Sequence, residues 1–261
     1  MIHFFRRIRQ GLINKERAGK YLLYAVGEIL LVVIGILLAL QINTWNEERK
    51  NNILEQEYYC RLLEDVEQDI EQIDKFLIDV QDRITSANNA IRLLKKEEAY
   101  KLEVATAMAY SISAIVSDFT PNNSAFEDLK SGANLNIIKD KDIIKAMNNY
   151  FKKAEQHLSI IRVNGEIALN RFFSYKDLYA TGWVHQQMQG RRFEQHMENE
   201  VKDLIEIDNS ETLSEDMKLQ LLNDALRYMS SNARQIQLYN DMKTEAVEVR
   251  ERLRTKCDIN S

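Results

Sequence analysis

The hydrophobic pattern of this chain changes character near residue 43. Residues 21–42, YLLYAVGEILLVVIGILLALQI, form an apolar run of 22 residues with one charge, Glu28, and no proline. A helix needs about 20 predominantly apolar residues to cross a bilayer. The run therefore predicts a transmembrane helix over 21–42, with a short segment, 1–20, before it and an extramembrane domain, 43–261, after it.

After the apolar run, apolar residues recur in alternating steps of four and three. One series covers four heptads from Val66 to Leu94, and similar series fall within 141–174 and 213–256. This spacing is typical of helices that pack along a seam. We therefore predict an all-α fold, in which an N-terminal transmembrane helix is followed by an elongated antiparallel helical bundle with coiled-coil-like seams. The first series comprises Val66, Ile70, Ile73, Leu77, Val80, Ile84, Ala87, Ile91 and Leu94.

Polar residues add detail to this bundle. Asn232 and Gln235 occupy seam positions of the last series, where buried amides fix the packing register at some loss of stability. The acidic run over 64–71 is expected mostly on the solvated face of its helix and not at a metal site. A shorter helix is expected over 101–117, followed by a loop, and the residues from Ser124 to Glu127 have the spacing of a capping box.

The charges around the apolar run predict its direction. Six Lys/Arg residues lie in 1–20 and three in 43–62, and the more basic flank of a span stays in the cytoplasm. This predicts a cytoplasmic N-terminus and a periplasmic C-terminal domain, held by a single pass through a bacterial inner membrane. Tyr21 and Tyr24 at one end and Trp45 at the other are the expected interface anchors, since aromatic residues gather at membrane surfaces.

Two alternatives concern the N-terminal region. The basic segment 1–20 has apolar residues at helical spacing, so it is either an amphipathic helix on the inner leaflet or a basic tail that only sets topology. A cleaved signal peptide would have an apolar region of about 7–15 residues and small residues at its cleavage site. The run here is longer and ends LALQINTW, which favours an uncleaved anchor.

Composition supports a helical protein and limits its partners. The 261 residues include one proline and 8 glycines, and 29% are charged, as in chains rich in long helices. Residues 1–50 carry 8 Lys/Arg and 4 Asp/Glu, so the rest of the chain carries 27 and 36, a balance of −9. The domain has no electrostatic basis for binding nucleic acid, whereas the N-terminus suits an anionic lipid surface.

Three residues inside the apolar run are candidates for contact with another helix. A carboxylate at bilayer depth costs a few kcal/mol, so Glu28 either faces a partner or water, or is neutral or snorkels to the nearby cytoplasmic interface. Gly35 and Ala39 have the small-xxx-small spacing that permits close helix packing, a pattern that also arises by chance. The expected partners are a second copy of the chain or another membrane protein.

The two cysteines lie far apart in the sequence. Cys60 is early in the first long helix and Cys257 is at the end of the last, so antiparallel packing would bring both to the membrane-proximal end of the bundle. An oxidising compartment would then allow a disulfide that closes nearly the whole domain. Free thiols are the alternative, because Cys60 lies beside the seam and not on it.

The sequence contains no recognisable catalytic or cofactor motif. Its four histidines form neither an H-E-x-x-H motif nor a Cys/His cluster with zinc spacing. It also lacks a glycine-rich phosphate loop and a G-x-S-x-G elbow. We therefore expect neither an enzyme nor a bound cofactor.

Two stretches resemble an uncharacterised family of bacterial membrane proteins, common in Bacteroidota and described as a domain of unknown function. The first, YLLYAVGEILLVVIGILLALQINTWNEERK, matches the pattern YxxYAxGEIxLVxxGIxxAxQINxWNE, and the second, FEDLKSGANLNIIKDKDI, covers 126–143 and precedes a helix with Tyr150. The resemblance extends over essentially the whole chain. It implies a single-pass membrane protein with a helical domain, and it favours a role for Glu28, but it implies no activity.

Two functional hypotheses follow. The first is a membrane-anchored helical envelope protein of unknown biochemical activity, acting as an interaction or scaffold component or as a subunit of a membrane complex. The alternative is a periplasmic ligand-sensing helical bundle. Because segment 1–20 is too short for a signalling domain, such a sensor would signal through a partner protein.

Overall fold

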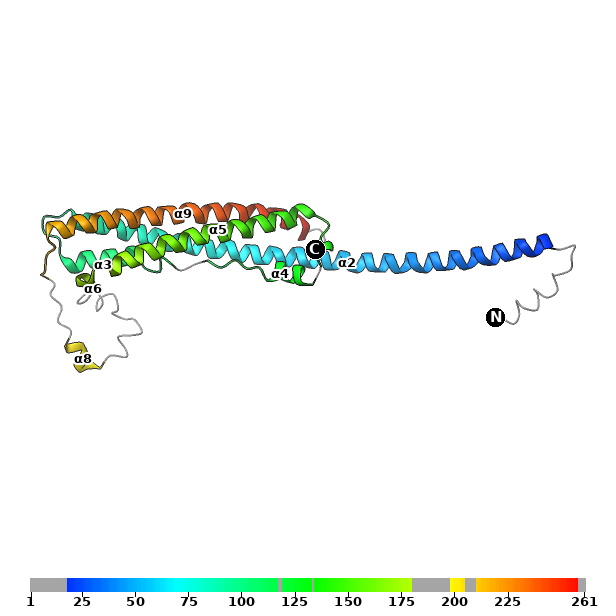
Figure 1. The fold of residues 1–261 in the computed structure, drawn as a ribbon, viewed down its shortest axis with the longest axis horizontal. Coiled ribbons are helices and arrows are strands. Elements are labelled where there is room, and N and C mark those ends of the chain that lie inside the picture. Colours follow the sequence, from blue (N-terminus) through cyan, green and yellow to red (C-terminus); the bar gives the residue numbers. More distant parts are fainter. Residues whose placement is uncertain (1–17, 117–118, 133, 180–197, 205–209, 258–261) are drawn as a thin grey trace. The chain divides into compact units, whose positions relative to one another are not determined.

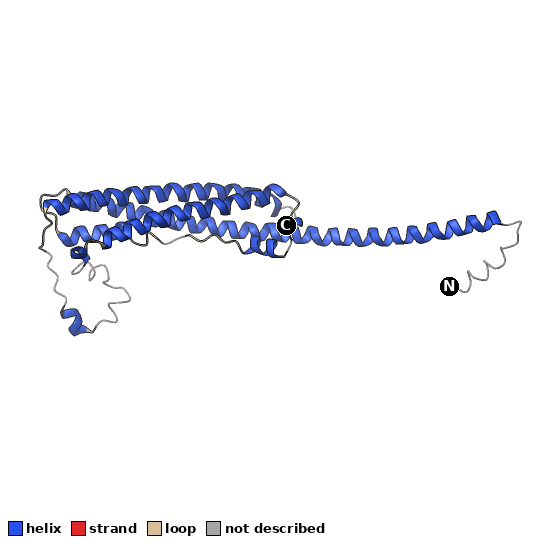
Figure 2. Ribbon diagram, in the orientation of Figure 1, coloured by secondary structure: helices blue, strands red, loops and turns tan. Residues whose placement is uncertain are grey.

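The computed structural model describes residues 18–116, 119–132, 134–179, 198–204 and 210–257. Within these residues the regular elements are helices, so the predicted all-α fold is confirmed (Figure 2). The β-type pairing among them is an isolated antiparallel bridge between Tyr100 and Thr212. Residues 1–17, for which an amphipathic helix is one expectation, lie outside the described part.

The chain divides into two compact units, Met1–Glu57 and Tyr58–Ser261. The first long helix, α2 (Ala18–Leu94), contributes residues to both of them. The boundary between the units lies beyond Ile42, the predicted end of the span. Each unit has its own pattern of burial.

In the first unit, α2 carries apolar side chains that the protein does not cover. Among the described helices, α2 is long and apolar enough to cross a membrane, and no part of its most apolar 18-residue window is buried. Leu23 is 77% exposed and Leu31 is 73% exposed. Soluble monomers rarely expose a continuous apolar surface of this length. The run predicted to span the membrane is therefore a helix that the described part of the chain does not cover.

In the second unit, three long helices lie side by side: α2 from Tyr58 onward, α5 (Lys141–Phe173) and α9 (Glu215–Cys257) (Figure 1). Helices α2 and α9 are antiparallel, because residue numbers rise along α2 as those of their partners on α9 fall. The pairs include Cys60–Cys257, Asp74–Lys243 and Arg83–Asn232. Helix α5 is antiparallel to α9 as well, because Lys153 bonds to Glu245 and Arg171 to Asp224. The predicted antiparallel bundle is thus present.

The chain between α2 and α5 packs beside the three long helices, but it does not form a continuous helix. Helix α3 (Lys101–Ser111) is followed by a non-helical stretch, and α4 (Ser124–Ser131) then leads to the short 3₁₀ helix η1 (Asn134–Asn136). The helix predicted over 101–117 is therefore wrong at its C-terminal end. Two short helices, α6 (Lys176–Tyr179) and α8 (Asn199–Asp203), lie between α5 and α9 in the chain.

The seam residues form the core of the second unit. Most of the first series is buried, namely Val66, Ile70, Ile73, Val80, Ala87 and Leu94, and the remaining members are partly buried. Aromatic contacts join the helices as well, and the rings of Phe76 and Tyr239 stack with their centroids 5.5 Å apart. Asn232 and Gln235 are 0% and 1% exposed, so the polar seam positions are inside the core.

Candidate functional site

The helical bundle is interrupted between α3 and α4, and we call this non-helical stretch, described over residues 112–116 and 119–123, the break. Helix α3 ends at Ser111, whose hydroxyl donates to the carbonyl of Met108 at 2.6 Å. Ala114 has a φ of 53°, in the left-handed region that residues other than glycine seldom adopt. Interrupting a helix inside a bundle leaves backbone groups without helical partners, and each buried one needs another partner. Side chains from neighbouring helices supply those partners.

Three buried polar side chains bind the first part of this break. Arg83 of α2, 5% exposed, donates from Nε to Asn232 Oδ1 at 2.8 Å and from Nη2 to Gln235 Oε1 at 2.5 Å. Each of the three also donates to a carbonyl of the break, with Asn232 bonding Ser111 at 2.9 Å, Gln235 bonding Ile115 at 2.9 Å and Arg83 bonding Ser113 at 3.4 Å. The network joins α2, α9 and the break.

Burial lowers the pKa of Arg83, although the nearby Tyr239 and Asp79 act in the opposite direction. The reason is that the charged guanidinium has lost its water. Its hydrogen bonds to two amide oxygens partly replace that water. The buried guanidinium therefore needs the amide oxygens of Asn232 and Gln235 as hydrogen-bond acceptors, and the break in turn needs the guanidinium as a donor.

Gly165 allows α5 to approach the break closely. A Cβ at this position would lie 2.9 Å from the carbonyl oxygen of Ile115 and 2.9 Å from Cγ1 of Val116. Both distances are shorter than van der Waals contact. Any side chain here would push the break away from α5, so the seam position requires glycine for steric reasons.

Two aspartates of α2 bind the other end of the break. Asp69, which is 0% exposed, accepts from the backbone N–H of Asn122 at 2.8 Å and from the hydroxyl of Tyr150 at 2.8 Å. Burial raises the pKa of Asp69 to about 6, and these two hydrogen bonds only partly oppose the shift. Asp65 accepts from the N–H of Ala125 at 3.0 Å, in the first turn of α4.

These contacts refine one expectation and correct another. The acidic run over 64–71, expected mostly on the solvated face, includes one residue in the core, Asp69. The capping box is wrong: Asn123 is the residue before α4 and makes no side-chain cap, while the Ser124 hydroxyl donates to Asp65 at 3.2 Å. The side chain that caps α4 is Asp65 of α2, and a motif in the local sequence around α4 cannot reveal it.

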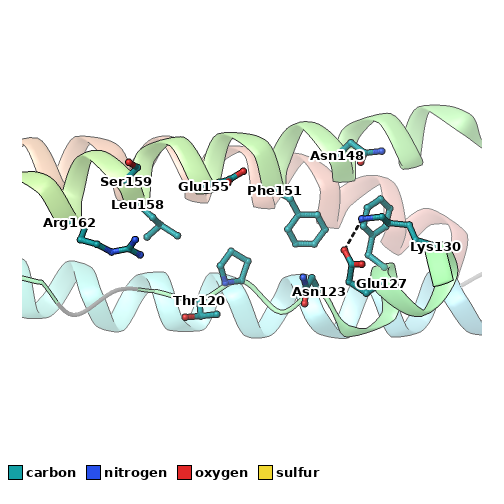
Figure 3. A pocket seen from close by; sticks show the side chains of 12 residues that line it. Thr120, Asn123, Glu127, Lys130, Asn148, Phe151, Glu155, Leu158, Ser159 and Arg162 are labelled. Atoms are coloured by element: carbon teal, nitrogen blue, oxygen red, sulfur yellow. Dashed lines mark hydrogen bonds and ion pairs between the residues drawn. The ribbon is translucent and has the colours of Figure 1, made fainter.

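A surface groove of about 520 Å³ lies between α5 and the chain that leads into α4. Figure 3 shows the ring of Phe151 pointing from α5 toward the segment that carries Thr120. Arg162 lies at one end of the groove (Figure 3). At the other end Lys130 donates to Glu127 at 2.8 Å. The groove thus combines an aromatic surface with charged groups at both ends.

The two cysteines are joined in the structure. Cys60 of α2 and Cys257, the last residue of α9, form a disulfide with their Cα atoms 5.0 Å apart and a sequence separation of 197. Free thiols, the other possibility left by the sequence, are not what the structure contains. The bridge closes a loop that includes nearly the whole second unit.

The candidate contact residues of the apolar run lie on the surface of the first unit. Glu28, Gly35 and Ala39 are exposed, and a Cβ on Gly35 would meet nothing within 4 Å. At 3.6 residues per turn these three positions lie within about 40° of one another around the helix. They therefore share one face, which the described part of the chain leaves uncovered.

The predicted interface anchors are aromatic residues of the same unit. Tyr24 is 72% exposed and Trp45 is 67% exposed, while the side chain of Tyr21 lies outside the described part.

Among the described residues no group of three or more His, Cys, Asp or Glu side chains could hold a metal ion. Arg83, Asp69 and the groove are the features that the sequence did not reveal.

The described residues define a class: an all-α protein with one helix suited to cross a membrane and a bundle closed by a disulfide. The chain belongs to a family of unknown function, DUF6090, which matches residues 28–176. This match includes Glu28, the break and α5 but not α9, so it is shorter than the expected whole-chain resemblance. No curated protein and no solved structure matches the chain significantly.

Proposed function

We propose that this chain is a single-pass membrane protein, with its N-terminus in the cytoplasm and its helical domain on the oxidising side of the membrane. There it acts as an interaction or scaffold component of a membrane complex. The observation that carries the proposal is the apolar run of α2, which the described part of the chain leaves uncovered on all sides, whereas the apolar seams of α5 and α9 are buried. A bilayer is the medium that would cover a helix apolar on all sides.

The orientation is supported by charge and by the disulfide. Segment 1–20 carries six Lys/Arg residues against three in 43–62, which favours a cytoplasmic N-terminus. Disulfides persist in oxidising compartments and are rare in the cytoplasm. The bridge between Cys60 and Cys257 lies in the domain after the span and supports the same orientation.

A partner in the membrane is supported by the face that Glu28, Gly35 and Ala39 share. A charged residue at bilayer depth costs a few kcal/mol, and such residues usually face the interior of a helix bundle and not lipid. Small residues at the same face allow the second backbone to come close. The partner is either a second copy of this chain or a different membrane protein.

Topology is tested with two reporters fused after Ser261 in a bacterial host. Alkaline phosphatase is active only outside the cytoplasm, and green fluorescent protein emits only inside it. We expect an active phosphatase and a dark fluorescent fusion. The control replaces Arg6, Arg7 and Arg9 with Gln, which should weaken this bias. A fluorescent fusion with an inactive phosphatase would refute the orientation.

The membrane partner is tested by site-directed crosslinking in intact membranes. Glu28→Leu and Gly35→Leu should each reduce the crosslinked species, because both change the shared face. Leu37→Phe adds bulk on the opposite side of the same helix and is the matched control. A crosslinked species that is equally abundant in all variants, or absent from the wild type, would count against a partner at this face.

The alternative function, a ligand-sensing bundle that signals through a partner, is favoured by one observation. This is the groove beside the break, which has a size within the range of small-molecule sites. Thermal-shift screening of the full chain in nanodiscs tests it. A small molecule that stabilises the wild type and does not stabilise Phe151→Leu would support sensing.

A further inference from the structure

The groove is a direct consequence of the break. A helix with its side chains is about 10–12 Å wide, and an extended chain is narrower. Where the chain passes from Phe119 to Asn123 without helical structure, it leaves open the space that a helix would fill beside α5. The residues of α5 that line this space run from Asn148 to Arg162.

The break is maintained by features that stability alone does not require. It needs the buried Arg83 network, the buried Asp69, the positive φ of Ala114 and the absence of a side chain at Gly165. A continuous helix with apolar seam residues would need none of them. Departures from regular structure that demand such compensation occur most often at functional sites.

We propose that this groove is a binding site for a carbohydrate. The ring of Phe151 and the ring of Pro121 are partly exposed and offer apolar surface for the C–H face of a sugar ring. Around them, Asn148, Glu155 and Arg162 bring an amide, a carboxylate and a guanidinium. These planar groups together donate and accept hydrogen bonds, as neighbouring sugar hydroxyls require.

The same residues argue against other ligand classes. A peptide strand would need backbone donors along the break, but Pro121 has no N–H and the N–H of Asn122 is bound to Asp69. An anion would need excess positive charge, whereas the cations Lys130 and Arg162 are balanced by two lining carboxylates.

The test uses the full chain in phospholipid nanodiscs, which avoids sugar-based detergents. Saturation-transfer difference NMR would be recorded with cellobiose, maltose and diacetylchitobiose as probes. We expect transfer to at least one of them. Phe151→Leu, which keeps an apolar side chain and removes the ring, should weaken binding about tenfold if the ring contributes about 1.4 kcal/mol.

Two further variants complete the experiment. Arg162→Ala changes an exposed residue at the groove and should also weaken binding, so the test does not depend on whether Phe151→Leu folds well. Phe173→Leu makes the same substitution on the same helix, at a residue that is 49% exposed and outside the groove, and should bind like the wild type. Absence of transfer from all three probes, or equal binding by wild type and both groove variants, would overturn the proposal. Because the groove lies within the bundle, carbohydrate binding does not depend on which side of the membrane the bundle occupies, and the two experiments can fail separately.

Discussion

The two units of this protein share one helix and treat apolar side chains in opposite ways. In the first unit Leu23 and Leu31 are 77% and 73% exposed, whereas in the second Leu62 and Val66 are both 0% exposed. All four belong to α2. Helix formation is therefore the same in both units, and the difference lies in what surrounds the helix.

The surroundings follow from the spacing of apolar residues. Between 21 and 42 they occupy every face of the helix, so no bundle partner could cover them all. From Val66 to Leu94 they follow one stripe with charged residues between them, which other helices can cover while water solvates the rest. Polar groups differ as well, since the second unit buries Arg83 and Asp69 within hydrogen-bond networks.

The largest expected effect comes from placing the same charge in each unit. Leu62→Arg puts an unpaired cation into the core and should unfold the bundle, with a loss above about 5 kcal/mol. Leu31→Arg should leave the unfolding midpoint of the bundle unchanged but weaken membrane integration by about 3 kcal/mol. Circular dichroism and carbonate extraction measure the two effects. If Leu31→Arg also unfolds the bundle, the two units are not independent.

Removing the guanidinium of Arg83 should have the next largest effect. Arg83→Leu leaves the amide oxygens of Asn232 and Gln235 and a carbonyl of the break without their donor, which should cost about 3–5 kcal/mol. Thermal unfolding of the full chain measures the loss. Changing all three residues to Leu should not restore stability, because the backbone carbonyls of the break still need donors. Full recovery in the triple variant would contradict this account.

Breaking the disulfide should have a smaller effect that is confined to the second unit. Replacing Cys60 and Cys257 with Ser frees a loop of 197 residues, and removing such a bridge should lower stability by about 2–5 kcal/mol. Carbonate extraction should be unchanged, since the bridge does not touch the apolar run. Treating the wild type with a reductant should reproduce the variant. An unchanged unfolding midpoint after complete reduction would show that the bridge does not constrain the unfolded chain.

The smallest expected effect concerns Asp69 and pH. Its pKa is raised to about 6 in the folded domain, above the ordinary value of about 4 for an unfolded chain. The folded state therefore binds this proton more tightly, and the contribution is present below pH 4 and lost as the pH rises through about 6. Asp69→Asn should flatten this dependence, removing at most about 3 kcal/mol between those limits. Unfolding curves at several pH values measure it, with Asp82→Asn, at an exposed position of the same helix, as the control. An identical pH dependence in Asp69→Asn and the wild type would contradict it.

The long helices could be predicted because the spacing of apolar residues within each segment is enough to indicate a helix. The ends expected for α5 and α9 agree within two residues with Lys141–Phe173 and Glu215–Cys257, since each is a continuous heptad series. The first series also locates the core of α2. The series marks only part of the buried face of α2, however. A neighbouring row at steps of seven is also largely inside the core, with four of its five residues buried: Leu62, Asp69, Phe76, Arg83 and Ala90. The positions of Asp69 and Arg83 in that row could have indicated that both are buried.

The break could not be derived from the sequence for a physical reason. Its carbonyls are satisfied by side chains about 120 residues away, from Asn232 and Gln235. The start of α4 is capped by Asp65, which lies 60 residues before Ala125. Local propensity predicts helix beyond Ser111, and non-local hydrogen bonds override it. The groove depends on the break and was hidden for the same reason.

The bridge between Cys60 and Cys257 has a mechanical consequence. Tension that enters the domain through the chain before residue 60 and leaves through the chain after residue 257 passes across the sulfur–sulfur bond. The residues between the two cysteines are outside that covalent path, so the bundle is shielded from stretching. With the bond reduced, the same load falls on the hydrogen bonds and the packed seams. The oxidised form is therefore expected to resist a pull between its two ends that would unravel the reduced form.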